Sequence, residues 1–281
     1  GGVSETSVMY VDNTSIQSYE NGTATYPFKN LQTAINVICN LNISCNLHVL
    51  GSSYGFTDIR NINDLAISFY NNVTIDGLYI RNSKVIFNSE NYGLTINGLK
   101  LDRSDVNIIG KSDTYAVINP IGNTNITVSN GQGKCVFSKW SKLSLKYVSL
   151  IGTDSYDLIV ATNSQLEIDH SRFDDYAGYY AINLDYNSTC QLDENVFVIG
   201  ASDSQHLFRV VRGSVLFTQQ TLTNYNQYVV SYSPKVIGAV IGKSLSSPVY
   251  YGDVDTVNVD YNFMQLTLSV GGARTNKKTV I

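Results

Sequence analysis

The sequence of 281 residues is poor in charged side chains, and its few cations are spread along it. Only 15% of the residues are charged, compared with roughly 25% in an ordinary soluble domain. The formal net charge is −4, and no run of lysine or arginine occurs. This distribution argues against nucleic acid or an anionic membrane surface as the partner. No apolar run approaches the roughly 18–20 residues of a membrane-spanning helix, so membrane insertion is not predicted.

Residues that bind metals are also scarce. The chain has three histidines and four cysteines, and Cys39, Cys45, Cys135 and Cys190 show none of the spacings of a zinc site. We therefore expect no metal and no cofactor. Cys39 and Cys45 are expected to be thiols, with a disulfide between them as the open alternative. Cys190 is expected to act as a small buried hydrophobic residue.

Proline is rare, with 4 in the chain, and tryptophan occurs once. Asparagine and tyrosine, by contrast, are abundant, with 29 and 20 residues. Neutral polar side chains of this kind suit turns, stacked ladders and contacts with sugars better than salt-bridged helices. Because 43% of the chain is hydrophobic, it can still bury a core.

Four segments repeat one spacing of apolar residues. They begin at Lys142, Gln165, Thr189 and Ser214 and read KLSLKYVSL, QLEIDHSRF, TCQLDENVF and SVLFTQQTL. The apolar positions that we equate are Leu143, Leu145 and Leu150; Leu166, Ile168 and Phe173; Cys190, Leu192 and Phe197; and Val215, Phe217 and Leu222. Alternation over the first three positions predicts a strand whose side chains point alternately into and away from a core.

A third apolar stretch closes each repeat before a turn residue. These stretches read DLIVATN (157–163), YAINLDYN (180–187), HLFRVVRG (206–213) and YVVSYSP (228–234). Each unit therefore contains three short strands in about 23–25 residues, which predicts a solenoid. We predict an all-β fold, a right-handed, single-stranded parallel β-helix. A leucine-rich repeat would need a helical segment in each unit, and a sandwich would not hold the register over so many repeats.

The same spacing continues on both sides of the four segments. Upstream, NVTIDGLYI (72–80) places Val73, Ile75 and Ile80 in the pattern, and GLTINGLKL (93–101) places Leu94, Ile96 and Leu101. Downstream, TVNVDYNFM (256–264) extends it. We see no linker, so a single domain over 1–281 is predicted. Its parts are an N-terminal lead-in with a capping helix (1–45), the coils (46–265) and a C-terminal segment (266–281).

The capping helix is predicted from YPFKNLQTAINVI (26–38). Phe28, Leu31, Ala34, Ile35 and Ile38 share one helical face, and Pro27 suits a helix start. Such a helix would cover the open end of the coil stack, since the ends of a solenoid need caps. NLHVLGSSYGFT (46–57) then reads as the first strand and its turn.

This N-terminal part resembles that of the pectate-lyase-like β-helices in bacteriophage tailspikes and tail fibres. The resemblance is carried by YVDNTS (10–15), NGTATYPFKNLQTAI (21–35) and LHVLGSSY (47–54), with an extra residue in the turn between Gly51 and Tyr54. It implies a homotrimer in the virion tail, next to other tail proteins, that binds host surface polysaccharide such as capsule or O-antigen. Many members of the family also cleave that polysaccharide, but a fold does not by itself fix an activity.

Acidic residues are concentrated in two neighbouring repeats. The register above stacks Lys146, Asp169 and Asp193 in one column and Tyr147, His170 and Glu194 in the next. Carboxylates one coil apart would be about 5 Å apart, close to the spacing of a retaining glycosidase pair. The catalytic candidates are Asp169, Asp174, Asp175 and Glu194. The alternative is that these acids form a solvated face, with Lys146 and Asp169 in an ion-pair ladder and Asp174 and Asp175 in a loop.

Tyrosines gather around the same acids. Exposed tyrosine stacks on sugar rings and bonds their hydroxyls, so we take as glycan-binding candidates Tyr176, Tyr179, Tyr180, Asp185, Tyr186, Tyr225 and Tyr228. The alternative is that these tyrosines line a trimer interface. Trp140 falls at a turn between coils, where we expect it to pack into the core.

Together these observations favour a receptor-binding segment of a phage tail fibre or tailspike over an enzyme. A polysaccharide depolymerase, either a glycosidase or a lyase, that uses paired carboxylates is the first alternative. A purely structural trimeric shaft is the second, and a bacterial adhesin of the same fold is a third. No lysine- or arginine-rich cleft is evident from the sequence.

Overall fold

The alternation of apolar and polar residues corresponds to short strands that pair in parallel. The computed structural model describes residues 6–111, 124–127, 134–152, 157–174, 181–192, 197–198, 208–210, 212–218, 249–250, 266–268 and 279–280. Within these ranges, three parallel sheets wind around one core, so the protein is a parallel β-solenoid, as predicted. A further small sheet joins β24 (Val249–Tyr250), β25 (Leu266–Leu268) and β26 (Thr279–Val280). The segment 256–264, which we expected to continue the coils, lies outside the described residues.

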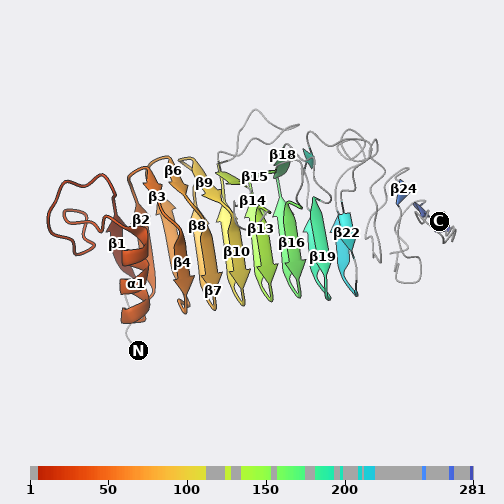
Figure 1. Ribbon diagram of the computed structural model, residues 1–281, viewed down its shortest axis with the longest axis horizontal. Helices are drawn as coiled ribbons and strands as arrows, with labels where there is room; N and C mark the ends of the chain where they lie inside the picture. The colour runs from red at the N-terminus through yellow and green to blue at the C-terminus, as the bar shows by residue number, and fades with distance from the viewer. Residues whose placement is uncertain are drawn as a thin grey trace.

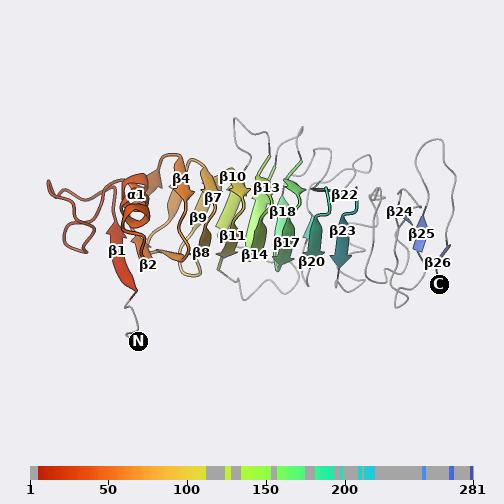
Figure 2. The ribbon, with the colours of Figure 1, turned by 90° about the horizontal axis from the view of Figure 1, so that it is seen from below.

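From β2 onward, successive strands of the solenoid belong to sheets A, B and C in turn (Figures 1 and 2). Sheet A is ordered β1 (Ser7–Val11), β2 (Cys45–Val49), β5 (Leu65–Phe69), β8 (Lys84–Asn88), β11 (Asp105–Ile109), β14 (Lys142–Lys146), β17 (Gln165–Asp169), β20 (Thr189–Leu192) and β23 (Val215–Thr218). Sheet B is ordered β3 (Ser53–Tyr54), β6 (Val73–Ile75), β9 (Leu94–Asn97), β12 (Thr124–Thr127), β15 (Val148–Ile151), β18 (Arg172–Asp174) and β21 (Phe197–Val198). Sheet C is ordered β4 (Thr57–Arg60), β7 (Leu78–Arg81), β10 (Leu99–Asp102), β13 (Val136–Lys139), β16 (Ile159–Thr162), β19 (Ile182–Asp185) and β22 (Phe208–Val210).

The core lies inside the three sheets and is built from every second residue of each strand. In the coil of β17, β18 and β19, the buried residues are Leu166, Ile168, Phe173, Ile182 and Leu184. These include three positions that the repeat pattern predicts to point inward. Like residues of successive coils stack, as Leu143 does on Leu166 and Leu145 on Ile168. The core is therefore a continuous apolar column, which a solenoid needs because no single coil can bury its own inner face.

The predicted cap is the helix α1 (Leu31–Leu41), which lies at the N-terminal end of the stack (Figure 2). It starts later than predicted. The side chain of Asn30 caps it by accepting hydrogen bonds from the backbone N–H groups of Gln32 and Thr33, so Pro27 precedes the helix instead of opening it. All five residues of the predicted apolar face are buried. The helix thus closes the open end of the core, as expected.

A column of buried serines fixes the turn between sheet C and sheet A. We call it the serine ladder, and its members are Ser83, Ser104, Ser141, Ser164, Ser188 and Ser214. The backbone N–H of each of the first five donates to the side-chain oxygen of the next, at 3.1–3.2 Å. The side-chain hydroxyl of each of the first five serines also donates to a backbone carbonyl two or three residues earlier in its own coil. Polar backbone groups that the tight turn buries are therefore satisfied from coil to coil.

The residue before each serine of the ladder has a left-handed backbone, with φ between 45° and 77°. These residues are Asn82, Arg103, Trp140, Asn163, Asn187 and Gly213. Asparagine and glycine tolerate this conformation, which is uncommon for other residues. Trp140 occupies such a position and is 45% exposed, so the expectation that it packs into the core is wrong. The turn directs its side chain away from the core.

Coil length varies more than the repeat pattern predicts. Paired residues of sheet A lie 20 apart from Leu65 to Val85 and 21 apart from Val85 to Val106. They lie 37 apart from Val106 to Leu143, and 23 apart from Leu143 to Leu166. The register is nevertheless continuous, because added residues fall between strands and leave the pairing unchanged.

The phase of the upstream repeats differs from the prediction. Val73 and Ile75 lie on β6 of sheet B, whereas Leu143 and Leu145, which we equated with them, lie on β14 of sheet A. The partner of Leu143 in the preceding coil is Val106. All three strands of a coil bury alternate residues, so apolar spacing alone does not identify the sheet.

Two of the predicted registers are also wrong by one residue. Cys190 pairs with Leu216, not with Val215, and Phe173 pairs with Val198, not with Phe197. A shift of one residue turns a side chain to the opposite face of a strand. In the first case the serine ladder sets the register, because Ser188 stacks on Ser214, two residues before the paired positions.

The cysteines agree with the expectation of thiols. Cys39 and Cys45 are not joined by a disulfide. Burial raises the pKa of the Cys45 thiol to about 11 and that of Cys135 to about 12. Cys190 is buried in the core, as predicted.

Candidate functional site

Two members of the predicted column of Lys146, Asp169 and Asp193 are stacked on sheet A, and Asp193 lies outside the described residues. The two residues pair across β14 and β17, and the ammonium lies 3.6 Å from a carboxylate oxygen of Asp169. The other carboxylate oxygen of Asp169 is 2.5 Å from Nδ1 of His170. The ring of His170 packs on that of Tyr147 in the coil before, with centroids 5.1 Å apart. Asp169 thus takes part in the ion-pair ladder that was the alternative to a catalytic role.

Asp185 and Tyr186, two of the glycan-binding candidates, form a cluster with Arg212 of the next coil. The guanidinium donates to both carboxylate oxygens of Asp185, at 2.6 and 2.5 Å, and to the hydroxyl of Tyr186 at 2.7 Å. It also lies over the Tyr186 ring, 3.9 Å from the centroid. The carboxylate of Asp185 raises the pKa of Arg212 further. Part of the polar surface proposed for sugar contacts is therefore engaged within the protein.

The remaining candidates are not brought together by the described structure. Asp174 is the last residue of β18. The others lie outside the described residues: Asp175, Tyr176, Tyr179, Tyr180, Glu194, Tyr225 and Tyr228. The paired carboxylates therefore stay a prediction.

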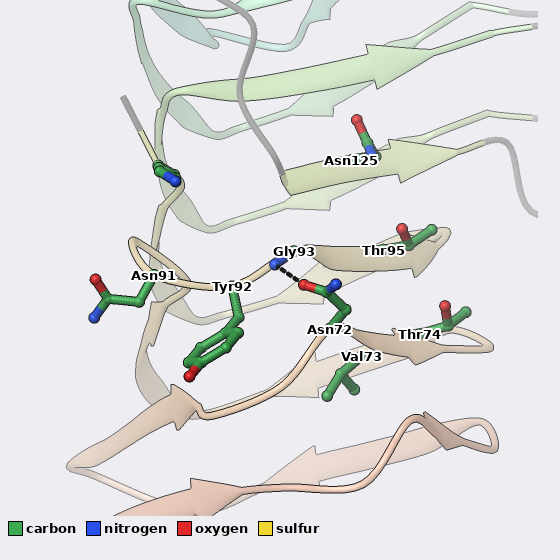
Figure 3. A pocket seen from close by; sticks show the side chains of 9 residues that line it. Asn72, Val73, Thr74, Asn91, Tyr92, Gly93, Thr95 and Asn125 are labelled. Carbon is green, nitrogen blue, oxygen red and sulfur yellow. Dashed lines mark hydrogen bonds between the residues drawn. The ribbon is translucent and has the colours of Figure 1, made fainter. Parts of the chain in front are cut away.

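A hollow that the sequence did not reveal lies on the outer surface of sheet B. Its volume is about 450 Å³, within the range of roughly 300–1,000 Å³ that small ligands occupy. Figure 3 shows the side chains that surround it. They come from β6, β9 and β12 and from residues just before β6, before β9 and after β11: Asn72, Val73, Thr74, Asn91, Tyr92, Gly93, Thr95, Lys111 and Asn125.

Stacking of coils builds the floor of this hollow. Thr74, Thr95 and Asn125 are partners on neighbouring strands and project outward in one column. Asn72 accepts a hydrogen bond from the backbone N–H of Gly93 at 2.7 Å, which ties two coils together at the edge of the hollow. Tyr92 lies on the same loop and is 40% exposed.

Apart from Lys111 and Val73, the lining is neutral and polar, and it offers both donors and acceptors. Each threonine hydroxyl can donate and accept, and each asparagine amide has two donor hydrogens and an acceptor oxygen. Tyr92 adds an aromatic ring at the rim. This combination suits a ligand with many hydroxyl groups and weakly apolar ring faces, which is the chemistry of a sugar.

Sequence reasoning missed the hollow because its residues come from different coils. Thr74, Thr95 and Asn125 lie on three successive strands of sheet B, and the second interval along the chain is longer than the first. The abundance of asparagine and threonine was the only sequence signal for such a site. Because we assumed a repeat of nearly constant length, Thr74, Thr95 and Asn125 were not aligned as equivalent positions.

Comparison with known proteins gave no relative: no family model, no curated protein and no solved structure matches this chain. Within the described ranges, no helix has the length and apolarity to cross a lipid bilayer. In the same ranges, no group of three or more histidine, cysteine, aspartate or glutamate side chains is placed to hold a metal ion.

Proposed function

We propose that this protein binds a cell-surface polysaccharide in the hollow on sheet B. The observation that carries the proposal is the column of Thr74, Thr95 and Asn125 beside the exposed ring of Tyr92. A parallel β-solenoid is compatible with such a function, because its stacked coils form a long face that a repetitive polymer can follow.

The biological setting is a second part of the proposal. The resemblance of the N-terminal segment to phage tailspikes and tail fibres supports a role in host recognition at the virion tail. In that setting the chain forms a homotrimer beside other tail proteins, and its ligand is a capsule or an O-antigen of the host.

The experiment is a binding measurement on capsule and O-antigen preparations from a panel of Gram-negative bacteria. Retained polysaccharide and released reducing ends are measured in parallel with the purified protein. Binding without release is the expected result. Release of oligosaccharides would instead favour the depolymerase, and Asp169→Asn would then be the first variant to examine. If the protein neither bound nor cleaved any polysaccharide of the panel, the proposal would be contradicted.

Variants of the hollow locate the site. Thr95→Val removes a hydroxyl while conserving the side-chain shape, and loss of one hydrogen bond of about 1 kcal/mol weakens binding about fivefold. Tyr92→Ala removes the ring at the rim and is expected to have a larger effect. Tyr19→Ala is the matched control, since Tyr19 is an exposed tyrosine of the N-terminal lead-in. Equal losses in Tyr92→Ala and Tyr19→Ala would place the ligand elsewhere.

A further inference from the structure

The outer surface of sheet C gathers cations that are far apart in the sequence. Strands β4, β7, β10 and β13 lie side by side there (Figure 1). On them Tyr79 pairs with Lys100, and Lys100 pairs with Phe137. We call this surface the cationic face, and its charged members are Arg60, Arg81, Lys100, Arg103, Lys134 and Lys139.

Three aromatic rings hold five of these six cations in place. Each ring has two cations within about 6 Å of its centroid, a distance at which cation–π attraction is effective. The pairs are Arg81 at 4.7 Å and Lys100 at 4.6 Å from Tyr79, Lys134 at 4.8 Å and Lys100 at 5.9 Å from Phe137, and Lys139 at 4.5 Å and Arg103 at 4.9 Å from Trp140. The charges are thus positioned before any ligand arrives, which lowers the ordering cost of binding.

The cationic face has an excess of positive charge although the whole chain is acidic. Four of its cations lie on these strands together with two carboxylates, Asp58 and Asp102, and the other two cations, Arg103 and Lys134, lie close to the strand ends. Asp58 pairs with Arg81 and Asp102 with Arg103. Among the described residues, no carboxylate forms an ion pair with Arg60 or Lys100. The formal net charge of the chain is −4, so positive charge is concentrated on this side.

We propose that the cationic face binds an acidic polysaccharide, one with carboxylate groups repeated along its length. Coils are spaced about 4.8 Å apart along the solenoid, so cations on different coils recur at intervals of that length. A polyuronate can place successive carboxylates against them. Trp140, which is 45% exposed, offers apolar surface to the sugar rings. This site is separate from the hollow on sheet B and does not depend on it.

The spacing of charges also distinguishes this ligand from nucleic acid. Duplex DNA carries one negative charge per about 1.7 Å of its axis, which is much denser than one cation per coil. A chain of net charge −4 would repel such a polymer outside the cationic face. A polysaccharide with one carboxylate per sugar or per few sugars matches the face more closely.

Trp140 provides a direct test, because it is the only tryptophan and lies on the proposed surface. Polygalacturonate is titrated into the protein at low salt while tryptophan emission is followed, with dextran as the neutral control polymer. We expect a saturable change with polygalacturonate that weakens as salt is added, because salt screens exposed charges, and no change with dextran. Absence of a saturable change would overturn the proposal.

A double variant then tests the charges. Arg60→Gln with Lys100→Gln removes two cations but leaves both cations at Trp140 in place, so the reporter is unaffected. Two exposed charge contacts together give about a tenfold loss of affinity. The matched control is Lys84→Gln with Lys142→Gln, which removes two charges from sheet A. Equal affinities of the two double variants for polygalacturonate would overturn the proposal.

Two further outcomes would assign the face to another partner and also overturn the proposal. One is tighter binding of a DNA oligonucleotide than of polygalacturonate at equal salt. The other is a change of oligomeric state in the Arg60/Lys100 double variant, measured by light scattering, which would identify a contact between copies of this chain. Failure of this proposal is distinguishable from failure of the proposed function, because variants of Tyr92 and Thr95 do not touch the cationic face.

Discussion

The serine ladder provides the sharpest test of what holds the coils in register, and Ser164 is its most connected member. Its side chain is 1% exposed. It accepts hydrogen bonds from the backbone N–H of Ser141 at 3.1 Å and from the hydroxyl of Ser138 at 3.0 Å, and it donates to the carbonyl of Thr162 at 2.9 Å. Three hydrogen bonds, two to the preceding coil and one within the turn, therefore depend on the Oγ atom of Ser164.

Replacing Ser164 by alanine removes that oxygen and leaves the other groups buried. The carbonyl of Thr162 keeps a partner, since the backbone N–H of Trp140 also donates to it at 3.0 Å. The backbone N–H of Ser141 loses its acceptor, and an unsatisfied buried donor costs about 1–3 kcal/mol. We therefore expect the free energy of unfolding to fall by about 2 kcal/mol in Ser164→Ala.

Urea titration followed by Trp140 fluorescence measures this change at the right place, because Trp140 directly precedes Ser141 on the ladder. Ser144→Ala is the control. Ser144 lies on the outer side of β14 and is only half-buried, and a surface substitution of this kind changes stability by less than about 0.5 kcal/mol. If both variants shifted the unfolding transition equally, the ladder would not stabilise the turn and the reasoning above would be refuted.

Two further predictions concern titratable side chains. Iodoacetamide at about pH 8 should alkylate half-buried Cys39 in the native protein and spare Cys45 until the chain unfolds. The reason is that burial raises the pKa of the Cys45 thiol to about 11. Equal alkylation rates of the two cysteines, measured by peptide mass spectrometry, would contradict this prediction. Burial lowers the pKa of His48 below its ordinary 6.5, so the unfolded chain binds a proton first and stability should fall as the pH drops below about 6.5. His48→Gln should remove part of this loss in urea titrations between about pH 7 and 5, and an unchanged pH profile would exclude His48 as its source.

The fold class followed from properties that each strand carries by itself. Alternating apolar residues specify which side of a strand is buried, and the inward positions Leu143, Leu145, Leu166 and Ile168 are all in the core. The amphipathic face of α1 was predictable for the same reason. Its start was not, because Asn30 is a stronger capping signal than the preceding proline.

Phase and register were less accessible, because they depend on which strands meet. An apolar alternation fits sheet A, B or C equally well, so Val73 was placed in the wrong sheet. A better marker was present in the sequence. A serine directly precedes each strand of sheet A from β8 onward, and in four of these six turns the residue before the serine is asparagine or glycine. In the last repeat it would have aligned Leu216, not Val215, with Cys190.

Both candidate binding surfaces were hidden for a related reason, and this links the architecture to function. Tyr79, Lys100 and Phe137 form one column of the cationic face, yet they belong to three different coils that are unequally spaced along the chain. The longer coil adds residues between β11 and β13 without altering how the strands pair. A surface in a solenoid is therefore defined by columns of residues that stack across coils. The segments that connect the strands can vary in length without changing these columns. Substitutions at the outward residues of a column can therefore change the binding surface, while the inward residues and the serine ladder keep the core intact. The residues of a binding surface have to be sought along the pairing register and not along the chain.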